Sequence, residues 1–234
     1  MNSAEIKVDI PNVFTNEKDR LDFMFERQHQ LASSFTTIEY GHGMLHDSLI
    51  VSTEDGDYHA KIPFDLDSRF GQDRIRKFCW YATEELVEMC ESVTNKQFWE
   101  ELSDATHFML ELCIISGISS EKILGRSFHD VCRLQTHWSY YKGPYYDLSL
   151  NQYYDGNDVL RIIRHLGMAA NCLKMKPWKQ TLVVTNVSKF EFQVKMAFLA
   201  LLDLARMTGM THDDFFKVYY SKSEVNNFRI RTKY

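Results

Sequence analysis

Residues 73–116, DRIRKFCWYATEELVEMCESVTNKQFWEELSDATHFMLELCIIS, carry the strongest helical pattern in the chain. Their apolar residues recur at helical spacing and predict one helix over about 73–91 and a second over about 96–116. The polar link at 92–95 is short, so we expect the two helices to be antiparallel neighbours. The stretch therefore predicts a helical hairpin, the unit of an antiparallel bundle.

The chain on the C-terminal side of this hairpin is also expected to be helical. Gly117 can end the second helix in a left-handed cap, and Ser119 can cap a third helix. The helical pattern resumes over about 159–173, 190–208 and 213–227. The predicted fold class is accordingly all-α.

The N-terminal part of the chain adds one helix and a small hairpin. A helix is expected to begin near Thr15, whose hydroxyl can cap it, because apolar residues recur at near-helical spacing from Leu21 to Leu31. A short β-hairpin is expected near 48–63, around a tight turn at Asp55 and Gly56. This hairpin is an insert in an otherwise helical bundle.

The bulk composition is that of a globular protein. The 234 residues are 44% hydrophobic and 25% charged, which fits a single domain over 1–234. The net charge of −5 gives no overall attraction to nucleic acid or to acidic membranes, so neither partner is expected. No stretch has the length of a membrane span, no signal region is recognised, and the five cysteines form no CxxC pair. We expect a soluble, cytoplasmic protein with reduced cysteines.

Two segments of the chain match at a constant offset. Phe98, Leu112 and Gly117 correspond to Phe190, Leu204 and Gly209, while Glu101 and Asp104 correspond to Gln193 and Met196. One interpretation is a degenerate duplication, with a catalytic half over about 15–155 and a degenerate second half over about 156–234. The alternative is that helix–glycine–helix turns of this kind are common, and the residues leave both open.

The most informative residues are two acidic pairs in the predicted hairpin: Glu85 with Glu88, and Glu101 with Asp104. Acids three residues apart project from one face of a helix and repel each other. Two such pairs on neighbouring helices would bring four carboxylates together, which is costly without a cation. Mg²⁺ prefers hard oxygen ligands of this kind. The alternative is an ordinary solvated acidic face, and spacing alone leaves both open.

The acidic pairs resemble a known signature once the following residues are included. Residues 85–88 and 101–104, followed by His107 and Phe108, are similar to the ExxE…ExxD-HF motif of all-α nucleoside triphosphate pyrophosphohydrolases. That group contains MazG, the dimeric dUTPases and the phage dCTPases. Residues 24–28 (MFERQ) resemble the first helix of dimeric dUTPases, in which the glutamine, here Gln28, helps to form the nucleotide site.

The C-terminal segment extends this resemblance. It is similar to the family pattern KNxxNxxRQxxGY, with four residues at the family spacing: Lys222, Asn226, Arg229 and Tyr234. Three positions depart from the pattern: Ser223 replaces Asn, Ile230 replaces Gln and Lys233 replaces Gly. These departures leave the expected fold unchanged and weaken the assignment of the nucleotide base that is bound.

The resemblance implies a fold, a reaction and a set of roles. It implies a MazG-like bundle that hydrolyses dUTP, dCTP or both to the monophosphate and pyrophosphate, acting as a homodimer. It implies two or more Mg²⁺ ions, with Mn²⁺ as a substitute, held by Glu85, Glu88, Glu101 and Asp104. Glu85 would orient or deprotonate the attacking water. The expected nucleotide-binding residues are Gln28, Lys222, Asn226, Arg229 and Tyr234.

Two other functions stay open on the sequence alone. One is the same chemistry on a purine or another nucleoside triphosphate. The other is a helical regulatory protein that has kept the fold and lost catalysis. The four retained acids argue against the inactive protein, because an idle site has no reason to keep a repulsive cluster.

Structural roles, without contact to substrate, are expected for several other residues. Trp80, Trp99 and Trp178 are expected in the core rather than against a base, and His107 is expected to be a core histidine with satisfied hydrogen bonds. If the C-terminal residues close over a nucleotide, we expect a hinge after Tyr220.

Overall fold

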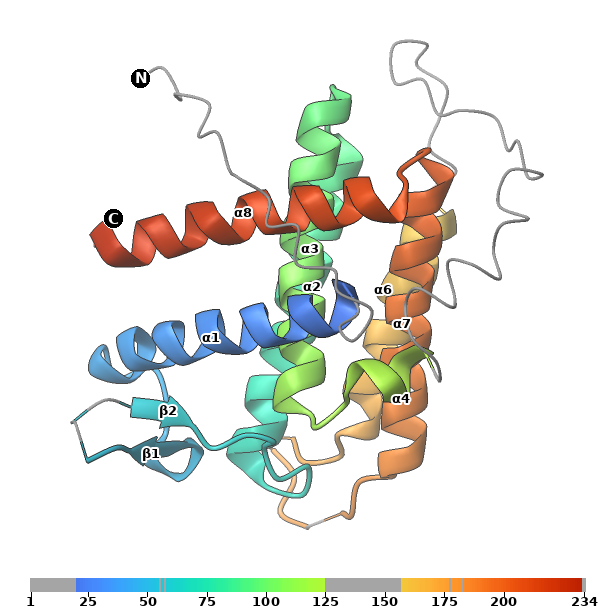
Figure 1. Cartoon of the computed structure of the whole chain (residues 1–234). Coiled ribbons are helices and arrows are strands. Elements are labelled where there is room, and N and C mark those ends of the chain that lie inside the picture. Colours follow the sequence, from blue (N-terminus) through green and yellow to red (C-terminus); the bar gives the residue numbers. More distant parts are fainter. Residues whose placement is uncertain are drawn as a thin grey trace.

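The computed structural model describes residues 20–54, 56, 58–124, 157–176, 178–181 and 183–232. These residues form seven α-helices, a short 3-10 helix and one two-stranded sheet (Figure 1). The helices are α1 Arg20–Gly41, η1 Asp47–Leu49, α2 Arg69–Glu91, α3 Asn95–Ile115, α4 Ser120–Leu124, α6 Asn157–Cys172, α7 Val187–Met207 and α8 His212–Thr232. The predicted all-α fold class is confirmed. None of the described helices is long and apolar enough to cross a membrane.

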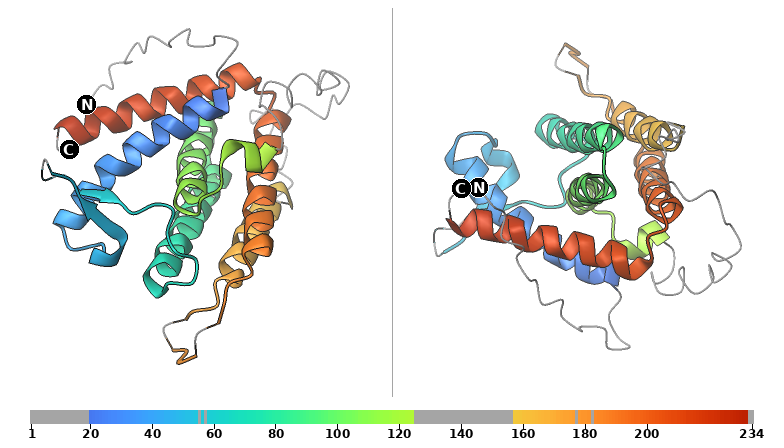
Figure 2. Two further views of the ribbon diagram at one scale, coloured as in Figure 1. Left: turned by 60° about the horizontal axis from the view of Figure 1, so that its bottom comes forward. Right: turned by 90° about the horizontal axis from the view of Figure 1, so that it is seen from above.

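Two helix pairs form the body of the molecule, and two long helices lie across it. Helix α2 packs tightly against α3, and α6 packs tightly against α7. The two pairs meet where α2 contacts α6 and α3 contacts α7. Seen along their axes, these helices form a four-helix bundle (Figure 2, right). The helices α1 and α8 run side by side across the bundle, and both contact α3 (Figure 1). α3 is therefore covered from several sides.

Local capping residues fix the hairpin of α2 and α3. The Ser68 side chain accepts a hydrogen bond from the backbone of Gly71, so α2 begins four residues before the predicted start at 73. Thr94 caps α3 in the same way. Gly117 ends the region after α3 with φ of 72°, the left-handed conformation that glycine adopts freely. The predicted helical hairpin and its cap are present.

The core follows the apolar stripes of the helices. α3 contributes one continuous stripe, and α7 contributes another from the opposite side of the bundle. Burying each such side chain stabilises the fold by about 1.5–3 kcal/mol. The fully buried members of these two stripes include Phe98, Leu102, Ala105, Met109 and Leu112 from α3, and Phe190, Val194, Phe198 and Leu201 from α7.

The expected β-hairpin is present beside α1. Strand β1, Ile50–Ser52, pairs antiparallel with β2, Tyr58–Ala60, and Gly56 in the turn between them has φ of 86°. The Thr37 hydroxyl of α1 donates to the carbonyl of Tyr58 at 2.8 Å and so fixes the hairpin to the helix. The expected helix start at Thr15 lies outside the described residues.

Two expectations about the surface and the C-terminus are wrong. The three tryptophans are not in the core: Trp80 is 60% exposed, Trp99 is 37% exposed and Trp178 is 76% exposed. The indole of Trp80 donates to Glu84 on its own helix, so its polar group has a partner at the surface. Helix α8 runs without interruption past Tyr220 to Thr232, so the expected hinge is not present in the described part of the tail.

Candidate active site

The hairpin of α2 and α3 brings the predicted acids together. Carboxylate oxygens of Glu85, Glu88 and Glu101 all lie within 4.8 Å of one another. Asp104, one helical turn beyond Glu101, is close enough to affect the charge of Glu85 but is paired with Lys222, whose Nζ lies 2.5 Å from its Oδ2. The arrangement is a cluster of three acids with a fourth beside it.

Glu85, Glu101 and Asp104 do not have the pKa values of ordinary surface carboxylates. Burial, followed by the charges of the other three acids, raises the pKa of Glu85 from 4.5 to about 7. Burial also raises the pKa of Glu101 and of Asp104, although Lys222 and Arg229 partly offset this for Asp104. The cluster therefore carries repulsion that a bound cation would relieve.

Helix α8 places cations opposite the acids. Lys222, Asn226 and Arg229 recur at helical spacing, and all three line the cavity that also contains Glu85 and Asp104. Arg231 does not line this cavity, and its Nε donates to a carbonyl of its own helix. Tyr234, the last residue expected to bind nucleotide, lies outside the described residues.

A cavity of about 320 Å³ joins these groups to a second polar region. Asp104 and Glu111 both line it and lie seven residues apart on α3, which is about 10 Å along a helix. Its walls come from α1, α2, α3 and α8, with these lining residues: Gln28, Phe35, Glu39, Arg74, Phe78, Tyr81, Glu85, Asp104, His107, Phe108, Glu111, Lys222, Asn226 and Arg229. Acids and cations thus meet around Asp104, and other polar groups gather around Glu111.

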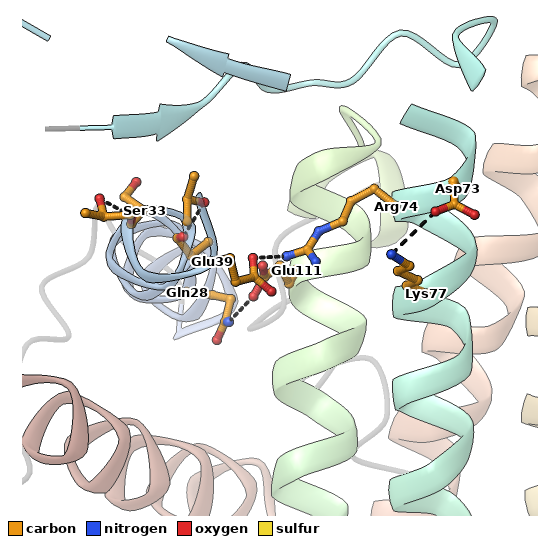
Figure 3. Close-up of polar contacts among 10 residues, drawn as sticks. Gln28, Ser33, Glu39, Asp73, Arg74, Lys77 and Glu111 are labelled. Carbon is orange, nitrogen blue, oxygen red and sulfur yellow. Dashed lines mark hydrogen bonds and ion pairs between the residues drawn. The ribbon is translucent and has the colours of Figure 1, made fainter. Parts of the chain in front are cut away.

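The polar region around Glu111 holds Gln28 in place (Figure 3). The Gln28 amide nitrogen donates to Oε2 of Glu111 at 3.1 Å, and the Tyr219 hydroxyl lies 3.3 Å from the Gln28 carbonyl oxygen. Arg74 reaches from α2 to form an ion pair with Glu39 of α1. Gln28 is 2% exposed, so it is a buried member of this region and not a residue of the outer helix surface.

Aromatic side chains line the cavity beside these polar groups. Phe78 and Tyr81 of α2 contact Phe108 of α3, with ring centroids 6.2 Å and 5.4 Å from that of Phe108. Faces of this kind suit the stacking of a planar base. None of Trp80, Trp99 and Trp178 lines this cavity.

His107 lies on α3 between Asp104 and Glu111. Its Nδ1 donates to the carbonyl of Ser103 at 2.8 Å, and its ring stacks on that of Tyr219 at 4.4 Å. Burial lowers the pKa of His107 to about 4, so the ring is neutral at physiological pH. The expectation of a core histidine holds for its burial, but Nε2 has no hydrogen-bond partner among the described residues.

Sequence reasoning missed three charged residues of the cavity: Glu39, Arg74 and Glu111. Glu111 had a visible signal, since it is the single charged residue in the apolar run from Phe108 to Ile115. A lone buried carboxylate in such a run is rare without a partner or a function. Arg74 and Glu39 gave no comparable signal, because their pairing depends on two helices far apart in the chain.

Comparison with known proteins agrees with the geometry. A family model described as dUTPase matches residues 76–234, more than half of the chain. No curated protein and no solved structure matches the chain significantly. The matched region includes all four acids and the cations of α8. The chain therefore belongs to the dimeric dUTPase family of all-α nucleotide pyrophosphohydrolases.

Proposed function

We propose that this protein hydrolyses dUTP, dCTP or both to the nucleoside monophosphate and pyrophosphate, with Mg²⁺, as a homodimer. One observation carries the proposal. A single cavity joins the acids of α2 and α3 to the cations of α8, and it continues to an aromatic and polar region around Glu111. A nucleoside triphosphate has the same order of parts, with metal-bound phosphates at one end and a planar base at the other.

The donor set fits a hard divalent cation. Glu85, Glu88 and Glu101 present oxygens within 4.8 Å of one another, and no histidine or cysteine joins them in the part of the chain that is described. Glu85, Glu88, Glu101 and Asp104 would hold the metal. A bound Mg²⁺ would polarise the phosphates and lower the pKa of a coordinated water.

The chain's own residues would then orient the substrate. Glu85, which has the most perturbed carboxyl of the cluster, would position the attacking water or accept its proton. Lys222 would exchange its present partner, Asp104, for a phosphate oxygen, and Arg229 would neutralise charge on the leaving pyrophosphate. Asn226 would donate a hydrogen bond beside them.

The homodimer is supported by apolar residues left at the surface. Trp80 and Val87 lie two turns apart on the exposed face of α2, at 60% and 47% exposure. Light scattering of the purified protein tests this part of the proposal, and a mass of one chain would contradict it.

A panel of nucleoside triphosphates tests the activity. With Mg²⁺, we expect dUTP or dCTP to yield pyrophosphate and monophosphate, faster than the purine triphosphates and the ribonucleotides. EDTA should abolish turnover, and Mg²⁺ or Mn²⁺ should restore it, because the site offers only hard oxygen ligands. Turnover that persists in EDTA, or release of single phosphates in place of pyrophosphate, would exclude the proposed reaction. A preference for a purine would correct the substrate and leave the metal chemistry in place.

A further inference from the structure

A chain of hydrogen bonds at the far end of the cavity links three helices. Gln28 of α1 donates to Glu111 of α3 at 3.1 Å. The hydroxyl of Tyr219, from α8, lies 3.3 Å from the Gln28 carbonyl oxygen and 3.0 Å from the Met24 carbonyl oxygen. All three side chains are buried, at 2%, 7% and 1% exposure respectively. Their donors and acceptors must therefore find partners among themselves or on a ligand.

The single proton of the Tyr219 hydroxyl allows two arrangements of this chain. When Glu111 is ionised, the Gln28 nitrogen donates to the carboxylate, and the Tyr219 proton is shared between the Gln28 and Met24 carbonyls. When Glu111 is protonated, its hydroxyl donates to the Gln28 carbonyl and the amide is reversed. The amide nitrogen then donates to the Tyr219 oxygen, and the Tyr219 proton bonds Met24 alone. The two ends of an amide have nearly the same shape, so both arrangements fit the same positions.

We propose that Glu111 is the specificity-determining residue of this cavity, and that it selects the base by setting the direction of the Gln28 amide. The inference rests on the proposed function, since it takes the base of a pyrimidine nucleotide to lie against Gln28 and Glu111. Glu111 and Gln28 act together at this end, about 10 Å along α3 from the acid that pairs with Lys222.

Uracil and cytosine differ in a way that these two arrangements match. Uracil presents the N3–H donor beside the O4 acceptor, whereas cytosine presents the N3 acceptor beside the amino donor at position 4. An ionised Glu111 offers an acceptor beside the free N–H of Gln28. A protonated Glu111 keeps its hydroxyl on the Gln28 carbonyl, and the second lone pair of that carbonyl is then free to accept from the amino group of cytosine. For one placement of the base, each arrangement therefore accepts one pyrimidine and leaves buried groups unpaired with the other, at about 1–3 kcal/mol.

The groups that face Glu111 place this exchange near neutral pH. Burial raises its pKa to about 7, Arg74 of α2 and the bond from Gln28 lower it, and Glu39 of α1 raises it (Figure 3). Tyr219 of α8 faces it as a neutral hydroxyl, because burial raises the pKa of that phenol. We therefore expect Glu111 to exchange its proton within the pH range in which the enzyme is assayed.

The ratio of kcat/KM for dUTP to kcat/KM for dCTP tests the inference. It is measured from about pH 5.5 to about pH 8.5, a range that spans the pKa of Glu111. Effects of pH on the metal and on the phosphates are common to both substrates and cancel in the ratio. We expect the ratio to change by at least about tenfold, with a midpoint near the pKa of about 7. Glu111→Gln, which is uncharged at every pH, should make the ratio independent of pH.

Glu39→Gln is the matched control. Glu39 is a carboxylate of the same cavity, but it pairs with Arg74 and not with Gln28. This variant should keep the pH-dependent ratio and shift its midpoint to lower pH, because a like charge that raises the pKa of Glu111 is gone. Circular dichroism of both variants checks that the helices are intact.

A constant ratio in the wild-type protein, or a ratio that still changes with pH in Glu111→Gln, overturns the inference. Failure of the proposed function gives a different result, namely no hydrolysis of either triphosphate at any pH. In that case, calorimetric binding of dUMP and dCMP at the two ends of the pH range decides the inference alone. A ratio of their dissociation constants that does not change with pH, or no binding of either, overturns it.

Discussion

Helices α3 and α7 share one frame but differ in their chemistry. α3 covers Asn95–Ile115 and α7 covers Val187–Met207, an offset of 92 at both ends. Their capping residues, Thr94 and Asn186, accept hydrogen bonds from equivalent positions. The glycines that follow them, Gly117 and Gly209, have φ of 72° and 84°. Both helices thus begin at the same kind of capping residue and end before a glycine in the left-handed conformation.

The difference lies on the faces that these helices turn to their partners. Glu101 and Asp104 of α3 are replaced in α7 by Gln193 and Met196. Gln193 is buried, and its side-chain oxygen lies 2.8 Å from Nδ1 of His165 of α6, so an amide stands here in place of a carboxylate. Helix α7 therefore keeps the frame of α3 without acids at these two positions, which supports a role other than folding for Glu101 and Asp104.

The correspondence is limited to one helix and its turns. α2 ends at Glu91, whereas α6 ends at Cys172, well before the position that the same offset would give. The matched part favours the interpretation of residues 156–234 as a degenerate copy of the catalytic half. The unmatched α2 and α6 favour the alternative, that helix–glycine–helix turns of this kind are common.

The largest expected effect comes from making α3 resemble α7. Asp104→Asn should lower kcat/KM by at least about 100-fold, because it weakens metal binding and removes the partner of Lys222. Met196→Leu, at the equivalent position of α7, should stay within about twofold of the wild type, since an apolar exchange there is mild. Steady-state rates with Mg²⁺ and circular dichroism measure both. A wild-type rate for Asp104→Asn would show that this acid is not part of the site.

A smaller effect is expected from the cations that α8 sets against α3. Arg229→Ala should lower kcat by roughly 10–100-fold, the value of one charged hydrogen bond that strengthens as the reaction proceeds. Arg231→Ala is the matched control, since Arg231 is equally basic but does not line the cavity. Its kcat should change by less than about threefold. Equal losses in the two variants would mean that α8 supplies only general positive charge.

The sequence predicted the parts of the site that depend on local spacing. Glu85 with Glu88, and Glu101 with Asp104, are each one turn apart, and the short link between their helices required them to face each other. The family resemblance, and not helical spacing, assigned Lys222, Asn226 and Arg229 to the nucleotide, and α8 brings all three to the cavity.

The parts that it missed depend on contacts between distant segments. Glu111 meets Gln28 across 83 residues of chain, and Arg74 meets Glu39 across two helices. The tryptophan prediction failed because it used the residue type alone and not the helix face on which each residue lies. Trp80 lies on the outer side of α2, while Phe78 and Tyr81 line the cavity. The aromatic wall therefore needed the packing of α1, α2 and α3 to be known.

The smallest expected effect is on stability without metal. The pKa of Glu85 is raised to about 7 in the folded state, against 4.5 in a free carboxyl. The folded protein thus holds this proton more tightly than the unfolded chain, and stability falls as pH rises from about 4.5 to about 7. Glu85→Gln, which is uncharged at every pH, removes this part of the loss of stability.

In EDTA at about pH 8, Glu85→Gln should therefore melt a few degrees above the wild type, corresponding to about 1 kcal/mol, because water still reaches and screens this carboxylate. At about pH 3.5, well below both pKa values, the two should melt together, since Glu85 is then protonated in both states. Saturating Mg²⁺ should reverse the order of the melting temperatures at high pH, because only the wild type keeps its full set of ligands.

Thermal melts of the wild type, Glu85→Gln and the exposed neighbour variant Glu100→Gln measure these differences. A lower melting temperature for Glu85→Gln in EDTA at high pH would identify Glu85 as a structural residue, and the contrast between the two helix pairs would then have no catalytic meaning.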